Sequence, residues 1–358
     1  MLPSFLKRRR LLSAMILSWC SPLIMSQGIK PPSGERDLQK ENSFDGQLIH
    51  PKTKRVLKMR VRLPRVKKKS PLIIYSPGLG SGLSNGGSWV QAWVDAGYVV
   101  VTISHPITND VIWDTQQVSF TQRLQQSLAS PQYDLRVLDC QFVITECLLG
   151  SQSTQMQTIF PSKSEIKLED WIDSDRIGIA GHSYGALTVQ SICRQMAGPL
   201  YDARIKAAIA FSPGAMSQAS AQNMRQVKIP FFCIMGDQDN QVTFKKGTEK
   251  MTLGMPLAKR RWVYDNLPKG LRQLWIVSPA DHMSFAGEVV DSQSFSRDIR
   301  VEAKGEQETW ERINEMTTRF WNYHLRAESK GSASSAAAVE YEKSLQNFLH
   351  PKDVFEIG

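Results

Sequence analysis

Short runs of consecutive apolar residues alternate along this chain with helix-compatible stretches, and this alternation limits the fold more than any other feature. In the run Tyr98–Ile103 the only polar residue is Thr102. A strand with two apolar faces is buried on both sides, as in parallel sheets that are covered by helices. The alternation therefore predicts a single doubly wound α/β domain with a mostly parallel central sheet.

The expected strands are Arg55–Leu63, Pro71–Ser76, Tyr98–Ser104, Arg176–Gly181, Ala207–Ser212, Pro230–Met235 and Gln273–Val277. The expected helices are Ser88–Ala96, Asp134–Leu149, Tyr184–Met196 and Glu306–Arg326, and the last has an apolar stripe that should pack into the core. Two long stretches, Pro106–Pro131 and Ser151–Asp173, are expected to be irregular excursions, that is, loops that run over the sheet and shape a substrate pocket.

The net charge of +10 is confined to two segments. Lys7–Arg10 contributes four positive charges, and the stretch Lys52–Lys69 contributes ten with no acidic residue. The other 30 basic residues (44 minus 14) are outnumbered by 34 acidic residues. A domain that is slightly acidic outside one stretch does not indicate a nucleic-acid partner.

The first basic cluster precedes the apolar run Leu11–Met25 and the polar residues Ser26–Gly28, which is the pattern of a signal peptide. We therefore expect a signal peptide over 1–26, a polar linker over 27–42, a catalytic domain over 43–328 and a C-terminal tail or helix over 329–358. The protein would be exported to the periplasm or the outside of the cell. The alternative is an uncleaved N-terminal membrane anchor.

The second basic cluster contains a strand in which apolar and basic residues alternate strictly from Leu57 to Leu63. One face should pack and the other should meet solvent. Basic residues also keep an edge strand from pairing with another chain, which fits this strand. The alternative to a solvated face is a patch that makes peripheral contact with anionic surfaces.

The motif Gly181-His182-Ser183-Tyr184-Gly185 lies between the apolar run that ends at Ala180 and a helix-compatible stretch. A strand, a tight turn and a helix around G-x-S-x-G form a nucleophile elbow, in which the glycines avoid collisions at the turn. The turn would raise the Ser183 hydroxyl to the helix N-terminus, where the helix dipole favours developing negative charge.

A serine hydroxyl needs a base and an acid to act as a nucleophile. His282 follows the late strand Gln273–Val277, and Asp239 follows the strand before it, so the chain order is Ser183, Asp239, His282. Asp237 is the rival acid, but Asp239 lies farther beyond the strand and has more reach to the imidazole. Asp281 adjoins His282 and is poorly placed for that bond.

An oxyanion hole needs one backbone N–H after the nucleophile and one from a loop after an early strand. Tyr184 would supply the first. Leu79, in the glycine-rich loop Ser76-Pro77-Gly78-Leu79-Gly80, would supply the second. The alternative is an ordinary glycine-rich turn. No Cys spacing suits a metal, and we expect neither a metal nor another cofactor. We expect four buried free thiols, Cys140, Cys147, Cys193 and Cys233, and the alternative is a disulfide between distant positions.

The chain resembles the dienelactone hydrolase and platelet-activating factor acetylhydrolase branch of the α/β-hydrolases over about Lys54 to Arg326. The segments that carry the resemblance are Tyr75–Gly80, Gly97–Val101, Asp175–Gly185 and Asp281–Phe285. The resemblance implies serine-dependent ester hydrolysis without a metal. Ser183 differs from the cysteine nucleophile of dienelactone hydrolases.

Two departures bear on the substrate. Acetylhydrolases usually carry His-Gly in the oxyanion loop, whereas this chain has Pro77-Gly78, a form similar to cutinase-like polyester hydrolases. Acetylhydrolases also place their acid soon after the strand that follows the elbow, where this chain has Ser212-Pro213-Gly214, so Asp239 takes that role.

The sequence therefore predicts an exported serine esterase that acts on a small-molecule, lipid or polymer ester through Ser183, Asp239 and His282. A polyester depolymerase and a phospholipid acetylhydrolase are the alternatives within the same chemistry. A non-catalytic binding module on a hydrolase scaffold is the alternative outside it. The acyl length, the leaving group and the oligomeric state stay open at this stage.

Overall fold

A computed structural model describes residues 42–106, 108, 119–160, 166–196, 198–288, 295–296, 303–326 and 335–358. The strands are β1 Ser43–Ile49, β2 Val56–Arg62, β3 Ser70–Ser76, β4 Val99–Ser104, β5 Ile172–His182, β6 Ile205–Phe211, β7 Phe231–Gly236, β8 Gln241–Lys246, β9 Glu249–Gly254, β10 Arg272–Val277, β11 Phe295–Ser296 and β12 Val354–Ile357. The α-helices are α2 Gly87–Asp95, α3 Phe120–Ser127, α4 Ser130–Leu149, α5 Thr154–Gln157, α6 Tyr184–Ile192, α7 Gln218–Gln222, α8 Leu257–Asn266, α9 Ala303–Trp321 and α10 Ser335–Gln346. Short 3₁₀ segments lie at Gly150–Gln152, Leu168–Asp170, Asn223–Gln226 and His282–Ala286, and a π-helical turn, Asn322–Arg326, extends α9.

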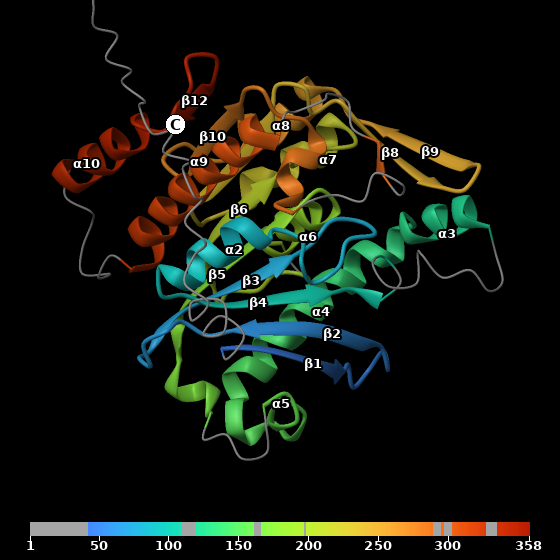
Figure 1. Cartoon of the computed structure of the whole chain (residues 1–358), viewed down its shortest axis with the longest axis vertical. Coiled ribbons are helices and arrows are strands. Elements are labelled where there is room, and N and C mark those ends of the chain that lie inside the picture. Colours follow the sequence, from blue (N-terminus) through green and yellow to red (C-terminus); the bar gives the residue numbers. More distant parts are fainter. Residues whose placement is uncertain are drawn as a thin grey trace, which may run out of the picture. The chain divides into compact units, whose positions relative to one another are not determined.

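Nine of the described strands form a sheet in the order β1-β2-β4-β3-β5-β6-β7-β10-β12 (Figure 1), and β11, β8 and β9 form a second, smaller sheet in that order. Neighbours from β4 to β10 are parallel, while β1, β2 and β12 pair antiparallel at the two sides. The predicted mostly parallel, doubly wound sheet is therefore confirmed.

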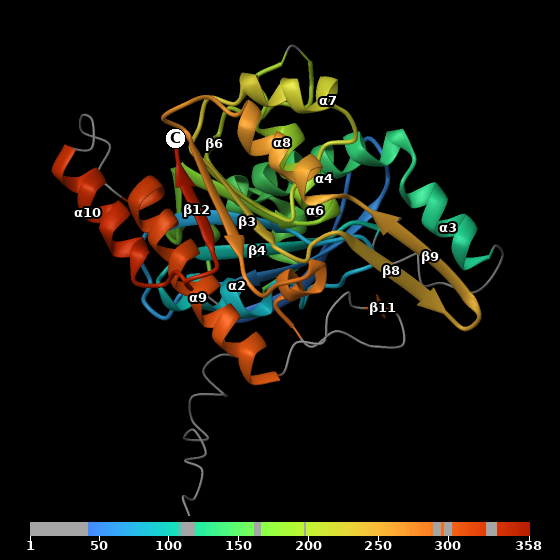
Figure 2. The same ribbon diagram turned by 90° about the horizontal axis from the view of Figure 1, so that it is seen from above.

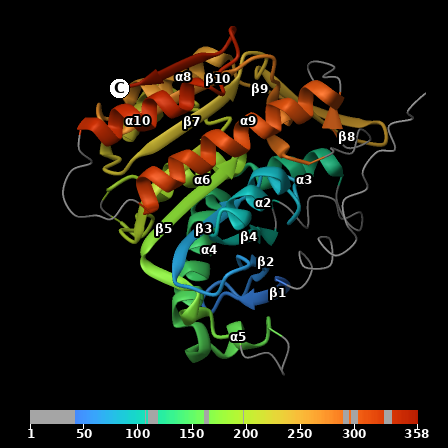
Figure 3. The same cartoon turned by 60° about the vertical axis from the view of Figure 1, so that its left-hand side comes forward.

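Helices cover both faces of this sheet, which is why its central strands are apolar throughout. Leu72 and Ile74 of β3 pack with α4, α6 and α8 on one face. Ile73 and Tyr75 of the same strand pack with α2, α9 and α10 on the other. Figure 3 shows α9 running beside α2 across that second face.

The α9 stripe expected to pack into the core does so, because Ile313, Met316 and Phe320 are fully buried. Most predicted strands and helices are found within a few residues of their expected ends. The helix expected over Tyr184–Met196 is an exception, since α6 ends at Ile192 and Arg194 forms a bridge with Val227.

The excursions contain structure that the sequence analysis did not predict. Pro106–Pro131 holds α3 and the start of α4, although 107 and 109–118 lie outside the described residues. Ser151–Asp173 holds α5, a 3₁₀ turn and the first residues of β5, with 161–165 outside the described residues.

The basic strand β2 alternates as predicted, with Leu57, Met59 and Val61 buried. It is not an edge strand, however, because β1 pairs along its outer side. Part of the charge is paired, since Arg60 binds Asp45 of β1 and Lys67 binds Asp170. The ten charges are spread along the strand and its two ends: Lys52, Lys54 and Arg55 precede β2, Lys58, Arg60 and Arg62 lie on it, and Arg65, Lys67, Lys68 and Lys69 follow it.

The two ends of the chain differ in what the structure describes. The predicted signal peptide and the linker up to residue 41 lie outside the described residues, so export stays a prediction. Residues 335–358 belong to the segment expected to be a C-terminal tail or helix, and they form α10 and β12, of which β12 pairs with β10. No helix among the described residues is both long and apolar enough to cross a membrane.

Strands β8 and β9 form a hairpin that projects from the main sheet toward α3 (Figure 2). The Glu249 carboxylate of the hairpin accepts hydrogen bonds from the Phe120 and Thr121 N–H groups, 3.2 and 2.9 Å away, at the N-terminus of α3. An apolar cluster, which includes Phe120, Val242 and Phe244, fills the space between them. The hairpin and α3 therefore form a cover beside the carboxyl end of the sheet.

Candidate active site

The carboxyl ends of β3 and β5 meet at the point where the chain changes direction in the sheet. From β3 the chain proceeds to β4 on one side, and then to β5 and β6 on the other. Ligands of open α/β sheets bind at such a switch point. It is here that the loop 76–80, after β3, lies beside the predicted nucleophile Ser183, after β5.

Ser183 lies at a sharp turn between β5 and α6, with φ of 56° and ψ of −114°. This left-handed conformation is strained for serine, and the turn persists because close contacts on both sides fix it. A Cβ on Gly181 would lie 2.6 Å from the Gly185 carbonyl oxygen, and one on Gly185 would overlap the Ser76 carbonyl oxygen. The elbow geometry and the need for both glycines agree with the sequence prediction.

His282 reaches Ser183 from the loop after β10. Its Nε2 lies 2.8 Å from Ser183 Oγ, although the two residues are 99 positions apart in the chain. His282 opens a short 3₁₀ turn that Asp281 caps by accepting a hydrogen bond from the Ser284 N–H, 2.8 Å away. The Trp310 indole N–H of α9 donates to the Ser284 carbonyl over 2.8 Å, which ties this loop to the helix layer.

The structure places Asp239, and not Asp237, against the histidine. Asp239 Oδ1 lies 2.7 Å from His282 Nδ1, and the carboxylate is completely buried. Asp237 instead accepts hydrogen bonds from the Ser278 hydroxyl and the Ala280 N–H, so it braces the loop that precedes the histidine. The three predicted residues thus form a continuous hydrogen-bonded chain.

Arg260 of α8 contacts the same carboxylate. Its Nη2 lies 2.8 Å from Asp239 Oδ1, and its Nε donates to the Asp239 carbonyl over 2.7 Å. Its Nη1 donates to the carbonyls of Ser212 and Pro213 at the end of β6. Burial alone would raise the pKa of Asp239, but the charges of Arg260 and then His282 hold that pKa well below its usual range. The acid is therefore ionised at neutral pH.

His182, the residue of the elbow that precedes Ser183, contacts the histidine loop. Its Nε2 donates to the His282 carbonyl over 3.0 Å, and the two rings lie 4.9 Å apart. Burial is the main reason that the pKa of His182 lies well below its usual range, and the nearby His282 lowers this pKa further. A neutral His182 therefore fixes the backbone of His282 and adds no charge to the site.

Leu79 and Tyr184 border Ser183 on two sides. Leu79 is nearly buried, and Gly78 lies so close to the elbow that a Cβ there would be 3.5 Å from the Ser183 Cβ. Tyr184 begins α6, so its N–H is among the unsatisfied donors of that helix N-terminus. Both predicted oxyanion residues therefore lie around the serine.

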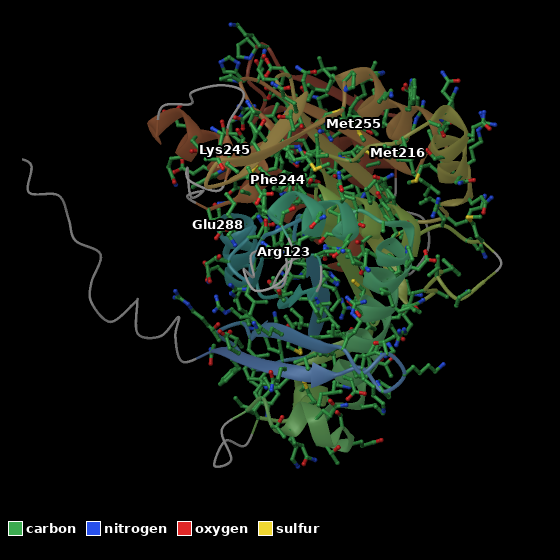
Figure 4. The ribbon with its side chains drawn as sticks, turned by 90° about the vertical axis from the view of Figure 1, so that its right-hand side faces the viewer. Arg123, Met216, Phe244, Lys245, Met255 and Glu288 are labelled. Carbon is green, nitrogen blue, oxygen red and sulfur yellow. The ribbon has the colours of Figure 1, made fainter. Side chains whose placement is uncertain are left out.

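A pocket of about 340 Å³ opens beside Ser183. Its wall is mostly apolar, with Leu187 from α6 and Val242, Phe244 and Leu253 from the hairpin. Figure 4 shows Met216, Phe244 and Met255 on the face of the molecule where this pocket lies. A wall of this kind suits an acyl or alkyl chain better than a charged group.

Sequence reasoning missed the hairpin, Arg260 and the role of His182. The hairpin had a signal, since Val242 and Phe244 alternate with polar residues ahead of a turn at Gly247. Arg260 had none, because the sequence does not distinguish it from its neighbour Arg261. Within the described ranges, no group of His, Cys, Asp or Glu side chains is arranged to hold a metal ion, and the four predicted free cysteines are buried and unpaired with one another.

Comparison with known proteins gave one family. The family model described as platelet-activating factor acetylhydrolase, isoform II, matches residues 53–261. That span is more than half of the chain and includes Ser183, Asp239 and Arg260, while His282 lies beyond it. A search of curated proteins found no match. The chain belongs to the platelet-activating factor acetylhydrolase isoform II family, within the α/β-hydrolase superfamily.

Proposed function

We propose that the protein is a serine esterase that hydrolyses carboxylic esters through a covalent acyl-enzyme. The observation that carries this proposal is the hydrogen-bonded chain from Ser183 Oγ through His282 to Asp239, at the mouth of an apolar pocket. Family membership independently implies a hydrolase of ester bonds.

In the first half-reaction His282 Nε2 takes the Ser183 proton while Oγ attacks the ester carbonyl carbon. The tetrahedral intermediate places its oxyanion toward the N–H groups of Leu79 and Tyr184. When the C–O bond breaks, His282 returns the proton to the departing alcohol. In the second half-reaction His282 deprotonates water, which attacks the acyl-enzyme, and the proton returns to Ser183 Oγ as the acid leaves.

A fluorophosphonate tests this mechanism directly, because it phosphonylates only an activated serine. We expect one label per chain, found on the peptide that contains Ser183, and we expect excess p-nitrophenyl butyrate to slow the labelling. Mass spectrometry of the intact protein and of its peptides measures both. A label on another serine, or none on folded protein, would contradict the proposal.

The acyl group is proposed to lie in the pocket under the hairpin, because its wall is apolar and it opens at Ser183. A phospholipid with a short acyl chain is the candidate that family membership favours. Pro77-Gly78 in the oxyanion loop keeps a polyester substrate as the alternative. A panel of p-nitrophenyl esters, a short-chain phospholipid and a polyester film separates these substrates.

Filling the pocket should shorten the acyl chain that the enzyme accepts. We expect Leu253→Trp to lower kcat/KM for a dodecanoate ester at least about tenfold, with the acetate ester little changed, because each methylene in such a pocket contributes about 1–3 kcal/mol. Lys245→Trp is the matched control, since Lys245 follows Phe244 on β8 and so points to the opposite face of the hairpin. Equal losses for acetate and dodecanoate would place the acyl chain elsewhere.

We also propose that the protein is exported, on the basis of the basic and apolar pattern of residues 7–25. The N-terminal sequence of the mature protein checks this, since cleavage after Ser26 leaves Gln27 first and an anchored protein keeps its leader.

A further inference from the structure

Arg136 of helix α4 is a completely buried arginine behind the candidate active site. Burial lowers the pKa of its guanidinium to about 10, so it remains charged at neutral pH. A buried cation is costly unless hydrogen bonds and nearby charges compensate it. Its contacts therefore need an explanation.

These contacts lead to both sides of Ser183. On one side, Arg136 Nη2 donates to the Pro77 carbonyl over 2.5 Å and to the Ser76 hydroxyl over 3.0 Å. On the other, Nε donates to Thr188 Oγ1 of α6 over 3.1 Å, and the guanidinium lies 4.9 Å from the centre of the Tyr184 ring. One side chain thus joins the loop after β3 to the helix after the nucleophile.

The loop is held on both sides of Leu79. The Pro77 carbonyl belongs to the peptide unit between Pro77 and Gly78. A hydrogen bond to it therefore fixes the orientation of the peptide plane just before the one that carries the Leu79 N–H. Beyond Leu79, the Gly80 N–H donates to the Thr108 carbonyl over 2.7 Å. Thr108 in turn accepts a hydrogen bond from Arg136 Nη1 through its hydroxyl, 2.6 Å away.

A second group of buried side chains orients the Ser76 hydroxyl that accepts from Arg136. His105 Nε2 lies 3.0 Å from Ser76 Oγ, and His105 Nδ1 lies 2.9 Å from Asp139 Oδ2. Asp139 is also 3.0 Å from Arg55. Ser76, His105 and Asp139 repeat the residue types of a catalytic triad, but Ser76 and His105 are 0% exposed and cannot meet a substrate. Their arrangement instead directs the Ser76 lone pairs toward Arg136.

We propose that Arg136 is a positioning residue for the oxyanion hole, which sets the Leu79 and Tyr184 N–H groups relative to Ser183. The proposal rests on the proposed esterase function. Arg136 touches neither the substrate nor the reacting atoms, and it acts through Pro77, Thr108 and the Tyr184 ring. Its positive charge, held behind the two donors, also favours the negative charge that develops on the carbonyl oxygen.

If Arg136 has this role, its replacement should weaken stabilisation of the transition state and leave substrate binding nearly unchanged. Because losing one oxyanion donor lowers kcat by about 10²–10³-fold, and an error of about 1 Å in position costs about 10²-fold, we expect Arg136→Met to lower kcat about 10²-fold, with KM for p-nitrophenyl butyrate nearly unchanged. Arg136→Lys keeps the charge but has no planar fork to hold these partners together, so it should recover only part of the loss.

An alkylboronic acid separates positioning from a purely structural role, because it forms an anionic tetrahedral adduct with the active serine. For Arg136→Met in the full chain, we expect the inhibition constant of butylboronic acid to rise in step with the fall in kcat/KM. Arg204→Met is the matched control, since Arg204 also donates to α4, at the Gln141 carbonyl and Thr145, away from the loop after β3. We expect its kcat and inhibition constant to match the wild type.

A fall in kcat without a rise in the inhibition constant, or a fall that only follows the folded fraction in thermal unfolding, would overturn the proposal. If Arg136→Met does not fold, Thr108→Val decides, because it removes the hydroxyl that accepts from Arg136 Nη1 and donates to the His105 carbonyl. The Thr108 carbonyl that holds the Gly80 N–H is kept, so the variant uncouples Arg136 from the loop without deleting that backbone hydrogen bond. We expect about a tenfold loss of kcat with the same rise in the inhibition constant, and wild-type behaviour would contradict the role. Failure of the esterase proposal itself is distinguished by Ser183→Ala, which would then keep the activity.

Discussion

The Ser183→Ala protein is expected to fold normally and to lose ester hydrolysis almost completely, with kcat lower by about 10⁶-fold. Without the hydroxyl there is no atom to form the acyl-enzyme, and His282 and Asp239 have no nucleophile to activate. The residual rate would come from substrate binding and the oxyanion donors acting on water. Hydrolysis of p-nitrophenyl butyrate, measured with purified protein of verified folding, gives the value.

Ser191→Ala is the control for this prediction. Ser191 lies on α6, the helix that follows Ser183, and its hydroxyl accepts a hydrogen bond from Arg194 over 3.2 Å. We expect its kcat to match the wild type within about twofold, because surface changes away from a site rarely alter it. If Ser183→Ala kept most of the activity, another residue would be the nucleophile and the assignments of His282 and Asp239 would fail with it.

The second large effect concerns the acid. We expect Asp239→Asn to lower kcat by about 10⁴-fold, since an amide favours the wrong tautomer of His282 and cannot stabilise the imidazolium. The same change leaves Arg260 buried beside a neutral group. Breaking a buried ion pair costs about 3–5 kcal/mol, so the free energy of unfolding should also fall. Steady-state kinetics on the folded fraction, together with thermal unfolding, separate the two losses.

Asp237→Asn tests the choice between the two carboxylates. Asp237 holds the Ser278 hydroxyl and the Ala280 N–H, so its replacement should lower stability by about 1–3 kcal/mol. Its kcat should remain within about tenfold of the wild type, because it does not contact His282. If Asp237→Asn lost more activity than Asp239→Asn, Asp237 would be the acid that acts on His282.

The central sheet could be predicted because its strands are buried on both faces and so stand out as apolar runs. The outer strands lack that signal. β1 contains Asp45, Gly46 and Gln47, and it is stabilised by pairing with β2 more than by its own pattern. β12 is four residues long, too short for any period to be visible. Tertiary pairing decides both of them.

The candidate triad could be predicted because each member follows a recognisable strand. Its supporting arginines could not. Arg260 and Arg261 are neighbours in the sequence, yet Arg260 is buried against Asp239 while Arg261 pairs with Glu356 near the surface. Arg136 likewise looks like a solvated charge on a helix. Only the packing of α4 and α8 against loops distant in the chain determines which cation is buried.

The pairing of β3 with β5 has a consequence for how the protein acquires its activity. Leu72 and Ile177 are partners in the sheet, although α2, β4, α3 and α4 intervene in the chain. Closing so long a loop has an entropic cost that must be met before the contact stabilises anything, and such pairings slow folding. We therefore expect Leu79 and Ser183 to come together only after most of the intervening chain has been ordered. Hydrolysis should appear late in refolding, after helix formation, so the onset of esterase activity reports the closure of the sheet.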